Sequence, residues 1–244
     1  MTTTLLSKEQ IIYQNDDFIA VNKPAGMLSI PDRKQSEPSL KDILINEFGT
    51  IYTVHRLDRG TSGVILFAKN EDAHRELSML FEGREVSKFY NGLVHGIPYP
   101  ANGTIDSPIA EHFSKNGKMM THAKGKPSVT DYETLENFGI YSWMKFQIHT
   151  GRTHQIRVHM QDLGNSIVCD ELYGDGQPVY ISKLKRHYHL SKKEDEEQPI
   201  LKRLALHSAL LSFQFKGEKY SLEASLPKDL RALLQQLRKW KGKD

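Results

Sequence analysis

Cysteine is almost absent from this chain: Cys169 is the one cysteine among 244 residues, which excludes an internal disulfide. Long apolar runs are missing too, since none approaches the roughly 18 residues that a membrane-spanning helix needs. The first residues lack the basic and apolar regions of a secretory signal. We therefore expect a cytoplasmic protein with no membrane association, in which Cys169 is a small buried apolar residue.

Neither sign of charge is in large excess, because 33 lysines and arginines and 30 acidic residues give a net charge of +3. The distribution of charge along the chain is more informative than the net charge. Residues 112–130 and 137–161 contain lysines and arginines but no acidic residue, and the C-terminal end is also basic. Such stretches can neutralise the phosphates of a nucleic acid, although ordinary solvated faces explain them equally well.

Hydrophobic periodicity predicts more strands than helices. Strands are predicted at 11–14, 18–22, 64–68, 89–94, 129–135, 143–149, 206–215 and 220–226. Helices are predicted behind Ser39, between Asn70 and Gly83, at 156–163, and behind Pro227. Because the strands cluster without regular β-α-β alternation, we expect an α+β fold with a largely antiparallel mixed sheet, flanked by helices and loops.

The most unusual segment is 55–63, His-Arg-Leu-Asp-Arg-Gly-Thr-Ser-Gly, which directly precedes a predicted buried strand. Loops that end on strands commonly hold catalytic side chains. Asp58 lies between Arg56 and Arg59. This pattern suits either a catalytic carboxylate or a structural loop in which the aspartate pairs with an arginine.

A second segment, 150–160, places Arg157 in the first turn of a predicted short helix behind a glycine turn. Its histidines raise the question of a metal site. However, His154 and His159 are five residues apart and do not share a helix face, and no glutamate lies between them in a zincin pattern. Glycine-rich phosphate loops are also absent. We therefore expect neither a metal nor a nucleotide cofactor.

Together these segments resemble the RluA-type pseudouridine synthases. Residues 55–63 are similar to the family's HRLDxxTSG signature, and 151–159 to its GRTHQIRVH motif. Further matches, in the family's order, are Lys23-Pro24-Ala25-Gly26, Lys88-Phe89-Tyr90, Asp170-Glu171-Leu172-Tyr173-Gly174, Leu206-His207 and Ser225-Leu226-Pro227. The ordered set covers nearly the whole chain and is far more specific than any single motif.

Three departures from the family pattern concern features outside the signature residues. Cys169 stands where the family usually has glycine before Asp170. Residues 180–203 are longer than the common connection and mix basic with acidic side chains, so we expect an exposed polar excursion, either mobile or facing RNA. We also expect residues 1–244 to form a single pseudouridine synthase catalytic domain without the separate N-terminal S4-type domain that several relatives carry.

The resemblance implies isomerisation of uridine to pseudouridine in structured RNA, ribosomal or transfer, without cofactor, metal or an obligatory protein partner. It makes Asp58 the catalytic carboxylate, Arg157 the arginine that pairs with it, and Tyr90 the ring that packs against the target base. A base inside a stem must be flipped out to reach Asp58. Arg56 is a candidate to fill the vacated stack, or alternatively to contact phosphate.

Two rival functions remain open at this point. One is a catalytically silent RNA-binding protein on the same fold, which an assay for pseudouridine would distinguish. The other is a hydrolase that cleaves nucleosides or glycosides without rejoining them. Such a hydrolase needs a second catalytic carboxylate near Asp58, and no motif supplies one.

Overall fold

The computed structural model of the chain divides into two compact units. Three strands, β5 (Ser87–His95), β10 (Tyr141–Ile148) and β11 (Leu206–Phe215), contribute residues to both units. Unit 1 comprises Met1–Asn91, Gln147–Thr153 and His207–Ser225, and unit 2 comprises Gly92–Phe146, His154–Leu206 and Leu226–Asp244. The structure describes residues 7–115, 117–185 and 196–241.

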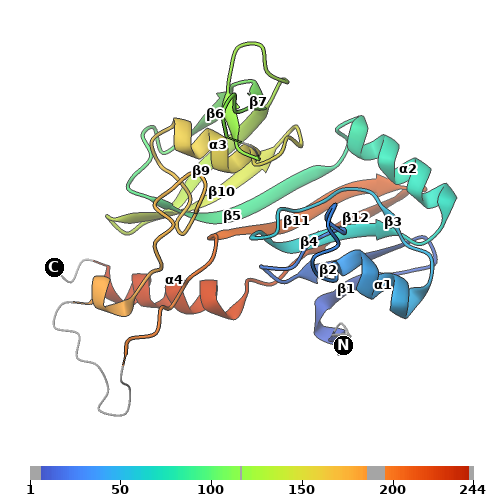
Figure 1. Cartoon of the computed structure of the whole chain (residues 1–244), viewed down its shortest axis with the longest axis horizontal. Helices are drawn as coiled ribbons and strands as arrows, with labels where there is room; N and C mark the ends of the chain where they lie inside the picture. The colour runs from blue at the N-terminus through green and yellow to red at the C-terminus, as the bar shows by residue number, and fades with distance from the viewer. Residues whose placement is uncertain (1–6, 116, 186–195, 242–244) are drawn as a thin grey trace. The chain divides into compact units, whose positions relative to one another are not determined.

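Unit 1 contains a sheet in which the neighbouring strands follow the order β1-β2-β4-β11, with β3 paired to β4 and β12 to β11 (Figure 1). Strands β4 and β11 are parallel, whereas the other pairs are antiparallel. The remaining elements of this unit are η1 (Lys8–Gln10), β1 (Ile11–Gln14), β2 (Phe18–Lys23), α1 (Leu40–Phe48), β3 (Tyr52–Thr53), β4 (Ser62–Ala68), α2 (Glu71–Glu82) and β12 (Glu218–Glu223).

The two helices of unit 1 begin where the sequence predicts. Ser39 caps α1 through a capping box, because its hydroxyl accepts from the Asp42 N–H and the Asp42 carboxylate accepts from the Ser39 N–H. Asn70 caps α2 by accepting from the Ala73 N–H at 2.8 Å. These bonds satisfy N–H groups that the helices themselves leave without partners.

Strands β2 and β4 of unit 1 are buried on both faces. On one face Phe18, Leu66 and Phe213 pack in one cluster with Ala73 and Leu77 of α2. The residues that alternate with them along β2 and β4 point to the other face, and they are also fully buried: Ile19, Val21, Ile65 and Phe67. The near-continuous apolar runs of these strands therefore follow from their double coverage.

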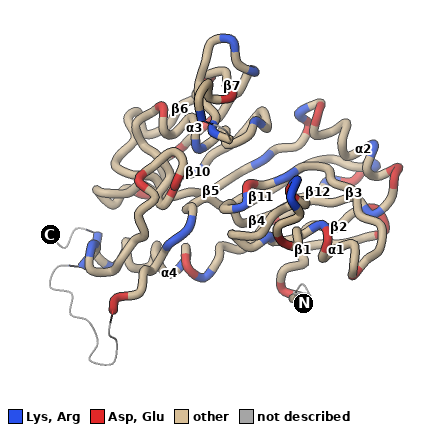
Figure 2. Tube along the Cα trace, viewed as in Figure 1, with Lys and Arg blue, Asp and Glu red and all other residues tan. Residues whose placement is uncertain are grey.

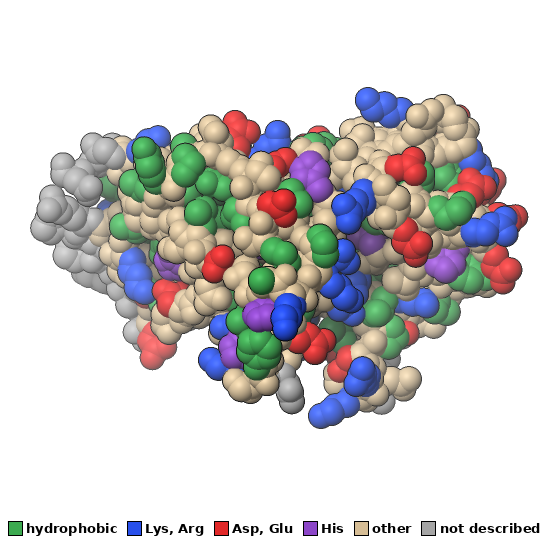
Figure 3. Space-filling model, turned by 90° about the horizontal axis from the view of Figure 1, so that it is seen from above, with side chains coloured by type: hydrophobic (Ala, Val, Ile, Leu, Met, Phe, Trp, Pro, Cys, Tyr) green, Lys and Arg blue, Asp and Glu red, His purple; other side chains and the backbone are tan. Residues whose placement is uncertain are grey.

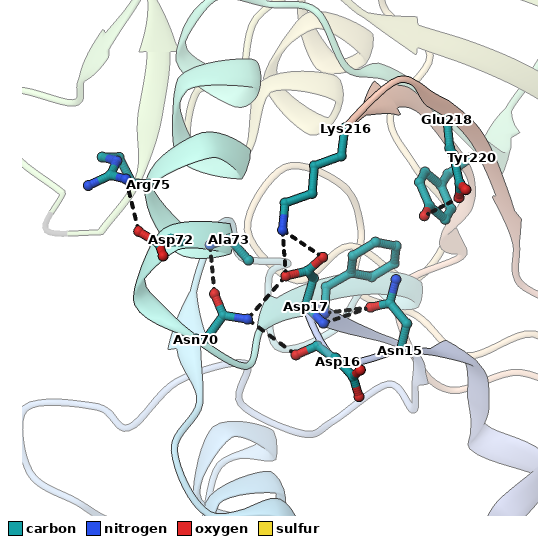
Figure 4. Close-up of polar contacts among 11 residues, drawn as sticks. Asn15, Asp16, Asp17, Asn70, Asp72, Ala73, Arg75, Lys216, Glu218 and Tyr220 are labelled. Carbon is teal, nitrogen blue, oxygen red and sulfur yellow. Dashed lines mark hydrogen bonds and ion pairs between the residues drawn. The ribbon is translucent and has the colours of Figure 1, made fainter.

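Hydrogen bonds connect the β1–β2 turn, the β11–β12 turn and the start of α2 in unit 1 (Figure 4). The Asn15 side chain accepts from the backbone N–H groups of Asp17 and Phe18, which closes the β1–β2 hairpin. Asp17 then receives hydrogen bonds from Lys216, in the β11–β12 turn, and from Asn70 at the start of α2. Three elements that are distant in sequence are thereby joined at one carboxylate.

Unit 2 contains strands in the order β5-β10-β9-β6, of which β6 and β9 are antiparallel, and a separate antiparallel hairpin of β7 and β8. Its further elements are β6 (Asn102–Asp106), β7 (Ile109–Glu111), β8 (Met119–Thr121), β9 (Val129–Asn137), α3 (Gln155–Asp162), η2 (Ile181–Lys183) and α4 (Lys228–Trp240). The predicted α+β class is thus confirmed. The sequence did not predict β3, β6, β7 or β8, which are short and carry partly exposed residues.

Helix α4 begins after Pro227, as predicted, and buries four leucines on one face: Leu230, Leu233, Leu234 and Leu237. Two arginines fix it within unit 2. Arg203 donates two hydrogen bonds of 2.7 Å to the Asp229 carboxylate in the first turn. Near the other end, Arg238 pairs with Glu136 of β9. The Arg238 guanidinium lowers the pKa of Glu136 by hydrogen bonding to it.

The predicted polar excursion at 180–203 lies partly outside the described residues, which omit 186–195. The prediction of an exposed segment is wrong at its C-terminal end. Leu201 is only 1% exposed, and a β-bridge with hydrogen bonds joins it to Val179. Ser182 and Lys183 are exposed, and Ser182 N–H donates to the Glu197 carboxylate.

Candidate active site

Asp58 lies in unit 1, in a turn that directly precedes β4. Its carbonyl oxygen accepts from the Thr61 N–H at 3.1 Å, which closes the turn, and the residue is half-buried. Strand β4 itself is buried along its whole length. The half-buried aspartate therefore lies just before a rigid, buried strand, a position that suits a catalytic side chain.

Lys23 and Gly26, at the two ends of the Lys-Pro-Ala-Gly motif, hold the residue that follows Asp58 in this turn. Lys23 is fully buried, and its ammonium group donates to the carbonyl oxygens of Pro24, Met27 and Arg59 at 3.0, 2.8 and 3.3 Å. The Gly26 N–H also donates to the Arg59 carbonyl, at 2.8 Å. A buried ammonium is costly unless its hydrogen bonds are satisfied, so this arrangement ties the lysine to the loop conformation.

The two arginines that flank Asp58 have different surroundings. The Arg59 side chain donates to the Gly26 carbonyl at 2.9 Å and pairs with Glu37 at 3.0 Å. Arg56 is exposed. Arg59 thus pairs with Glu37, whereas Arg56 presents its charge to solvent.

His55 begins the signature and contributes a neutral ring. Its Nε2 accepts from the Leu66 N–H at 3.0 Å, and the ring stacks on Phe81 at 4.5 Å between centroids. Burial, with a smaller effect of the Lys88 charge, lowers the pKa of His55 to about 3. The imidazole therefore carries no charge at neutral pH and acts as a structural acceptor.

The glycine that ends the signature allows two strands to approach closely. Gly63 has φ +114°, and a Cβ placed there would lie 2.1 Å from the carbonyl oxygen of Ser208, its partner on β11. Next to it, the Ser62 hydroxyl lies 2.9 Å from Nδ1 of His207, whose Nε2 lies 3.0 Å from the Ala224 carbonyl. The Thr-Ser-Gly and Leu-His motifs therefore meet at the start of β4.

Tyr90 lies on the part of β5 that belongs to unit 1, and it is 7% exposed. Burial raises the pKa of its phenol, and the nearby charge of Asp58 raises it further, while a hydrogen bond with Ser208 opposes the shift. The structure thus brings Tyr90 and Asp58 close enough to interact. The phenol is protonated at neutral pH and is not available as a phenolate base.

Arg157 belongs to unit 2, where it lies in the first turn of α3. Its Nε and Nη2 donate to the two carboxylate oxygens of Asp170 at 2.7 and 2.8 Å, and its guanidinium lies 4.9 Å from the ring centre of Tyr173. Asp170 also accepts from the backbone N–H groups of Leu172 and Tyr173. Sequence reasoning missed this partner, although Asp170 opens one of the matching motifs. The pairing of Arg157 with Asp58 stays a prediction.

The histidines of the 150–160 segment have structural contacts within unit 2. The Nδ1 atom of His154 lies 2.8 Å from the Tyr173 hydroxyl, and the ring nitrogens of His159 lie 2.9 Å from the Thr130 hydroxyl and the Ser107 carbonyl. Burial lowers the pKa of His159. Among residues 7–115, 117–185 and 196–241, no group of three His, Cys, Asp or Glu side chains has the arrangement of a metal site.

Cys169 is 4% exposed, which confirms the prediction that it is buried. Its backbone has φ +59°, in the left-handed region that costs a non-glycine residue roughly 1–2 kcal/mol. This explains why glycine suits the position in the related family. The thiol lies 3.2 Å from the Gln177 carbonyl, and burial raises its pKa to about 11, so it is an unreactive thiol.

Comparison with known proteins agrees with these features. Residues 17–162 match the family model described as RNA pseudouridylate synthase. The chain belongs to the RluA-type pseudouridine synthases. An RNA pseudouridine synthase of Chlorobaculum parvum is 37% identical, over 93% of this chain and 74% of that protein, and ribosomal large subunit pseudouridine synthase D of Buchnera aphidicola is 34% identical, over 92% and 72%.

The structural comparison supports the same assignment for this pseudouridine synthase. The human protein RNA pseudouridylate synthase domain containing 4 superposes with a TM-score of 0.72 at 26% identity, covering 93% of this chain and 92% of its own. This chain is therefore an isomerase that acts on uridine in RNA. Within the portion of the chain that the structure describes, no helix is long and apolar enough to cross a membrane.

Proposed function

We propose that this pseudouridine synthase modifies uridines in large-subunit ribosomal RNA, in the cytoplasm, with both units acting as one catalytic domain. Support for the substrate comes from relatives named ribosomal large subunit pseudouridine synthase D, which are 30–34% identical over at least 92% of this chain. Transfer RNA is the alternative substrate that the experiment below must separate. The proposal includes no cofactor, metal or obligatory protein partner.

Asp58 is the proposed catalytic group. The reaction breaks the bond between C1′ and N1, rotates the uracil, and joins C1′ to C5, whose proton is lost while N1 gains one. A carboxylate next to C1′ either stabilises the positive charge that develops on the sugar or attacks it. Uracil leaves as a delocalised anion, so a second carboxylic acid of the glycosidase type is not needed.

Tyr90 is proposed to hold the flipped base against its ring. A stacked base gains about 1–3 kcal/mol from such a contact. Since its phenol is protonated at neutral pH, the hydroxyl serves as a hydrogen-bond donor or relays a proton, and does not act as a ready phenolate.

Arg157 is proposed to pair with the Asp58 carboxylate. Its position in unit 2 is fixed by the two hydrogen bonds to Asp170 and by the face of Tyr173. A guanidinium held in this way loses little side-chain freedom when it meets another anion.

RNA binding is proposed to depend on local basic clusters and not on net charge. Basic and acidic side chains share the face of the molecule seen in Figure 3. Lysines lie along the loop between β7 and β8 (Figure 2), where Phe113 is 77% exposed and lies two residues before Lys115. An exposed ring among lysines suits a single-stranded or flipped base and its phosphates.

Arg56, exposed beside Asp58, is proposed to fill the stack that the flipped uridine vacates.

The observation that carries the proposal is the loop of unit 1, which is fixed through its backbone and presents Asp58 near the buried Tyr90. The test is to map pseudouridines in total RNA from a deletion strain, its parent, and strains complemented with the parental gene or with Asp58→Asn. Loss of one or more ribosomal sites, restored by the parental gene alone, is expected. Loss confined to transfer RNA would overturn the substrate assignment, and restoration by Asp58→Asn would overturn the catalytic one.

A further inference from the structure

Ser29 makes two hydrogen bonds to the residue that precedes Asp58. It lies between β2 and α1, is 4% exposed, and belongs to neither a helix nor a strand. Its hydroxyl donates to the Leu57 carbonyl at 2.8 Å and accepts from the Leu57 N–H at 3.1 Å. One side chain thus satisfies both polar groups of the Leu57 backbone.

These two bonds fix the peptide groups on either side of Leu57. Leu57 is 7% exposed, so its N–H and carbonyl need partners within the protein. The second of the two peptide groups leads directly into Asp58. On the other side of the aspartate, the Arg59 carbonyl is held by Lys23 and Gly26. The backbone is therefore restrained both before and after the catalytic side chain.

Ser29 is itself anchored to the start of α1. Its carbonyl accepts from the Lys41 N–H at 3.2 Å, and the Leu28 carbonyl accepts from the Leu40 N–H at 2.8 Å. These N–H groups belong to the first turn of the helix, which has no internal partners for them. The capping box of Ser39 fixes the same turn. A continuous set of hydrogen bonds therefore runs from the helix to Leu57.

We propose that Ser29 is a positioning residue for pseudouridine formation: its hydroxyl sets the direction in which the loop presents the Asp58 carboxylate to C1′ of the target uridine. Ser29 does not act on the substrate itself. The inference rests on the proposed function, in which Asp58 is the catalytic group. A displacement of about 1 Å in a reacting group can cost about 100-fold in rate, so a positioning role is measurable.

The test compares Ser29→Ala with a matched control, Ser142→Ala. Ser142 is fully buried in unit 2, and its hydroxyl donates to the Gly96 carbonyl at the same 2.8 Å. Both variants lose a hydrogen bond from a buried hydroxyl to a carbonyl, and Ser29→Ala also loses the bond from the Leu57 N–H. We expect Ser29→Ala to lower kcat by about 10- to 100-fold with KM for RNA within about twofold. We expect Ser142→Ala to lower the melting temperature while keeping kcat near parental.

Two further variants cover the case in which Ser29→Ala does not fold. Ser29→Thr keeps the hydroxyl and should restore most of kcat, and Ser29→Cys keeps the size with a weaker donor and should give an intermediate kcat. Equal kcat in the Ser29 variants and Ser142→Ala would overturn the positioning role. Asp58→Asn is measured in parallel: if it is active, the proposed function fails, whereas an inactive Asp58→Asn beside a fully active Ser29→Ala refutes only the role of Ser29.

Discussion

The loop that carries Asp58 and the helix that carries Arg157 are held in opposite ways. In the loop, hydrogen bonds to backbone atoms of Leu57, Asp58 and Arg59 hold the chain on both sides of the aspartate. In α3, the side chain of Arg157 makes the anchoring contact, through two hydrogen bonds to Asp170. The backbone bonds that hold the loop therefore do not depend on the Asp58 side chain, whereas the bonds that anchor Arg157 are lost when its side chain is changed.

The largest expected effect on stability is that of Arg157→Met. The Asp170 carboxylate has no exposed surface, and removing the guanidinium leaves it buried without its main partner. Breaking a buried ion pair from one side costs about 3–5 kcal/mol. Urea unfolding should show that loss, and Arg157→Lys should show a smaller one because lysine keeps the charge without the two-pronged geometry.

The control for this prediction is the double variant Arg157→Met with Asp170→Asn. Asparagine keeps an acceptor for the N–H groups of Leu172 and Tyr173 but has no charge to bury. We expect the double variant to be more stable than Arg157→Met alone. If Arg157→Met unfolds at the parental urea concentration, the contrast between the two regions does not hold.

The second prediction concerns His55, where the loop is anchored through a side chain. Its folded pKa of about 3 lies below the ordinary value of 6.5, so the unfolded chain binds the proton first as pH falls. The neutral ring makes its full contribution to the free energy of unfolding above about pH 6.5. This contribution decreases as pH falls toward about 3, by up to ~1.4 kcal/mol per pH unit. His55→Gln should show a shallower loss between about pH 7 and pH 5. Identical pH slopes for both proteins would contradict this account.

The third prediction separates the ring of Tyr90 from its hydroxyl. Tyr90→Phe should keep most RNA affinity, while Tyr90→Ala should lose about 1–3 kcal/mol because the stacking face is removed. Fluorescence titration with a substrate RNA fragment measures both. Equal losses in the two variants would argue against stacking, and a Phe variant that binds normally but stalls would assign the hydroxyl to proton transfer.

The smallest expected effect is that of metal removal. The Nδ1 atom of His154 contacts the Tyr173 hydroxyl, and the two ring nitrogens of His159 contact Thr130 and Ser107. The proposed chemistry also needs no Lewis acid. Exhaustive chelation should leave turnover unchanged, provided that the RNA keeps its fold. Stoichiometric metal in the protein, with activity lost on its removal and regained on its return, is the contrary result.

Features that depend on local pattern could be predicted from the sequence. Ser39, Asn70 and Pro227 mark the starts of α1, α2 and α4, because capping and the fixed φ of proline are properties of a few adjacent residues. The family motifs identified Asp58 and Tyr90, and both residues belong to unit 1 of the structure. The short strands β6, β7 and β8 escaped prediction because they carry few buried apolar residues.

Contacts between distant segments could not be predicted. The parallel pairing of β4 with β11 joins Gly63 to Ser208, residues that no local pattern relates. The Asp170 partner of Arg157 and the Ser29 contacts with Leu57 likewise depend on how the chain folds back. For the segment around Asp58, a motif therefore identifies the proposed reacting group, and the tertiary structure identifies the contacts that hold its loop.

The most direct test of the account is the turnover of Asp58→Asn, measured with its melting temperature and RNA affinity. Because asparagine has almost the same shape as aspartate and keeps polar contacts, we expect the melting temperature to stay within about 3 °C and the affinity within about twofold. Asparagine cannot carry the negative charge, so pseudouridine formation should fall by at least about 1000-fold in single-turnover assays. Near-parental turnover by a pure, folded Asp58→Asn protein would contradict the catalytic assignment of Asp58.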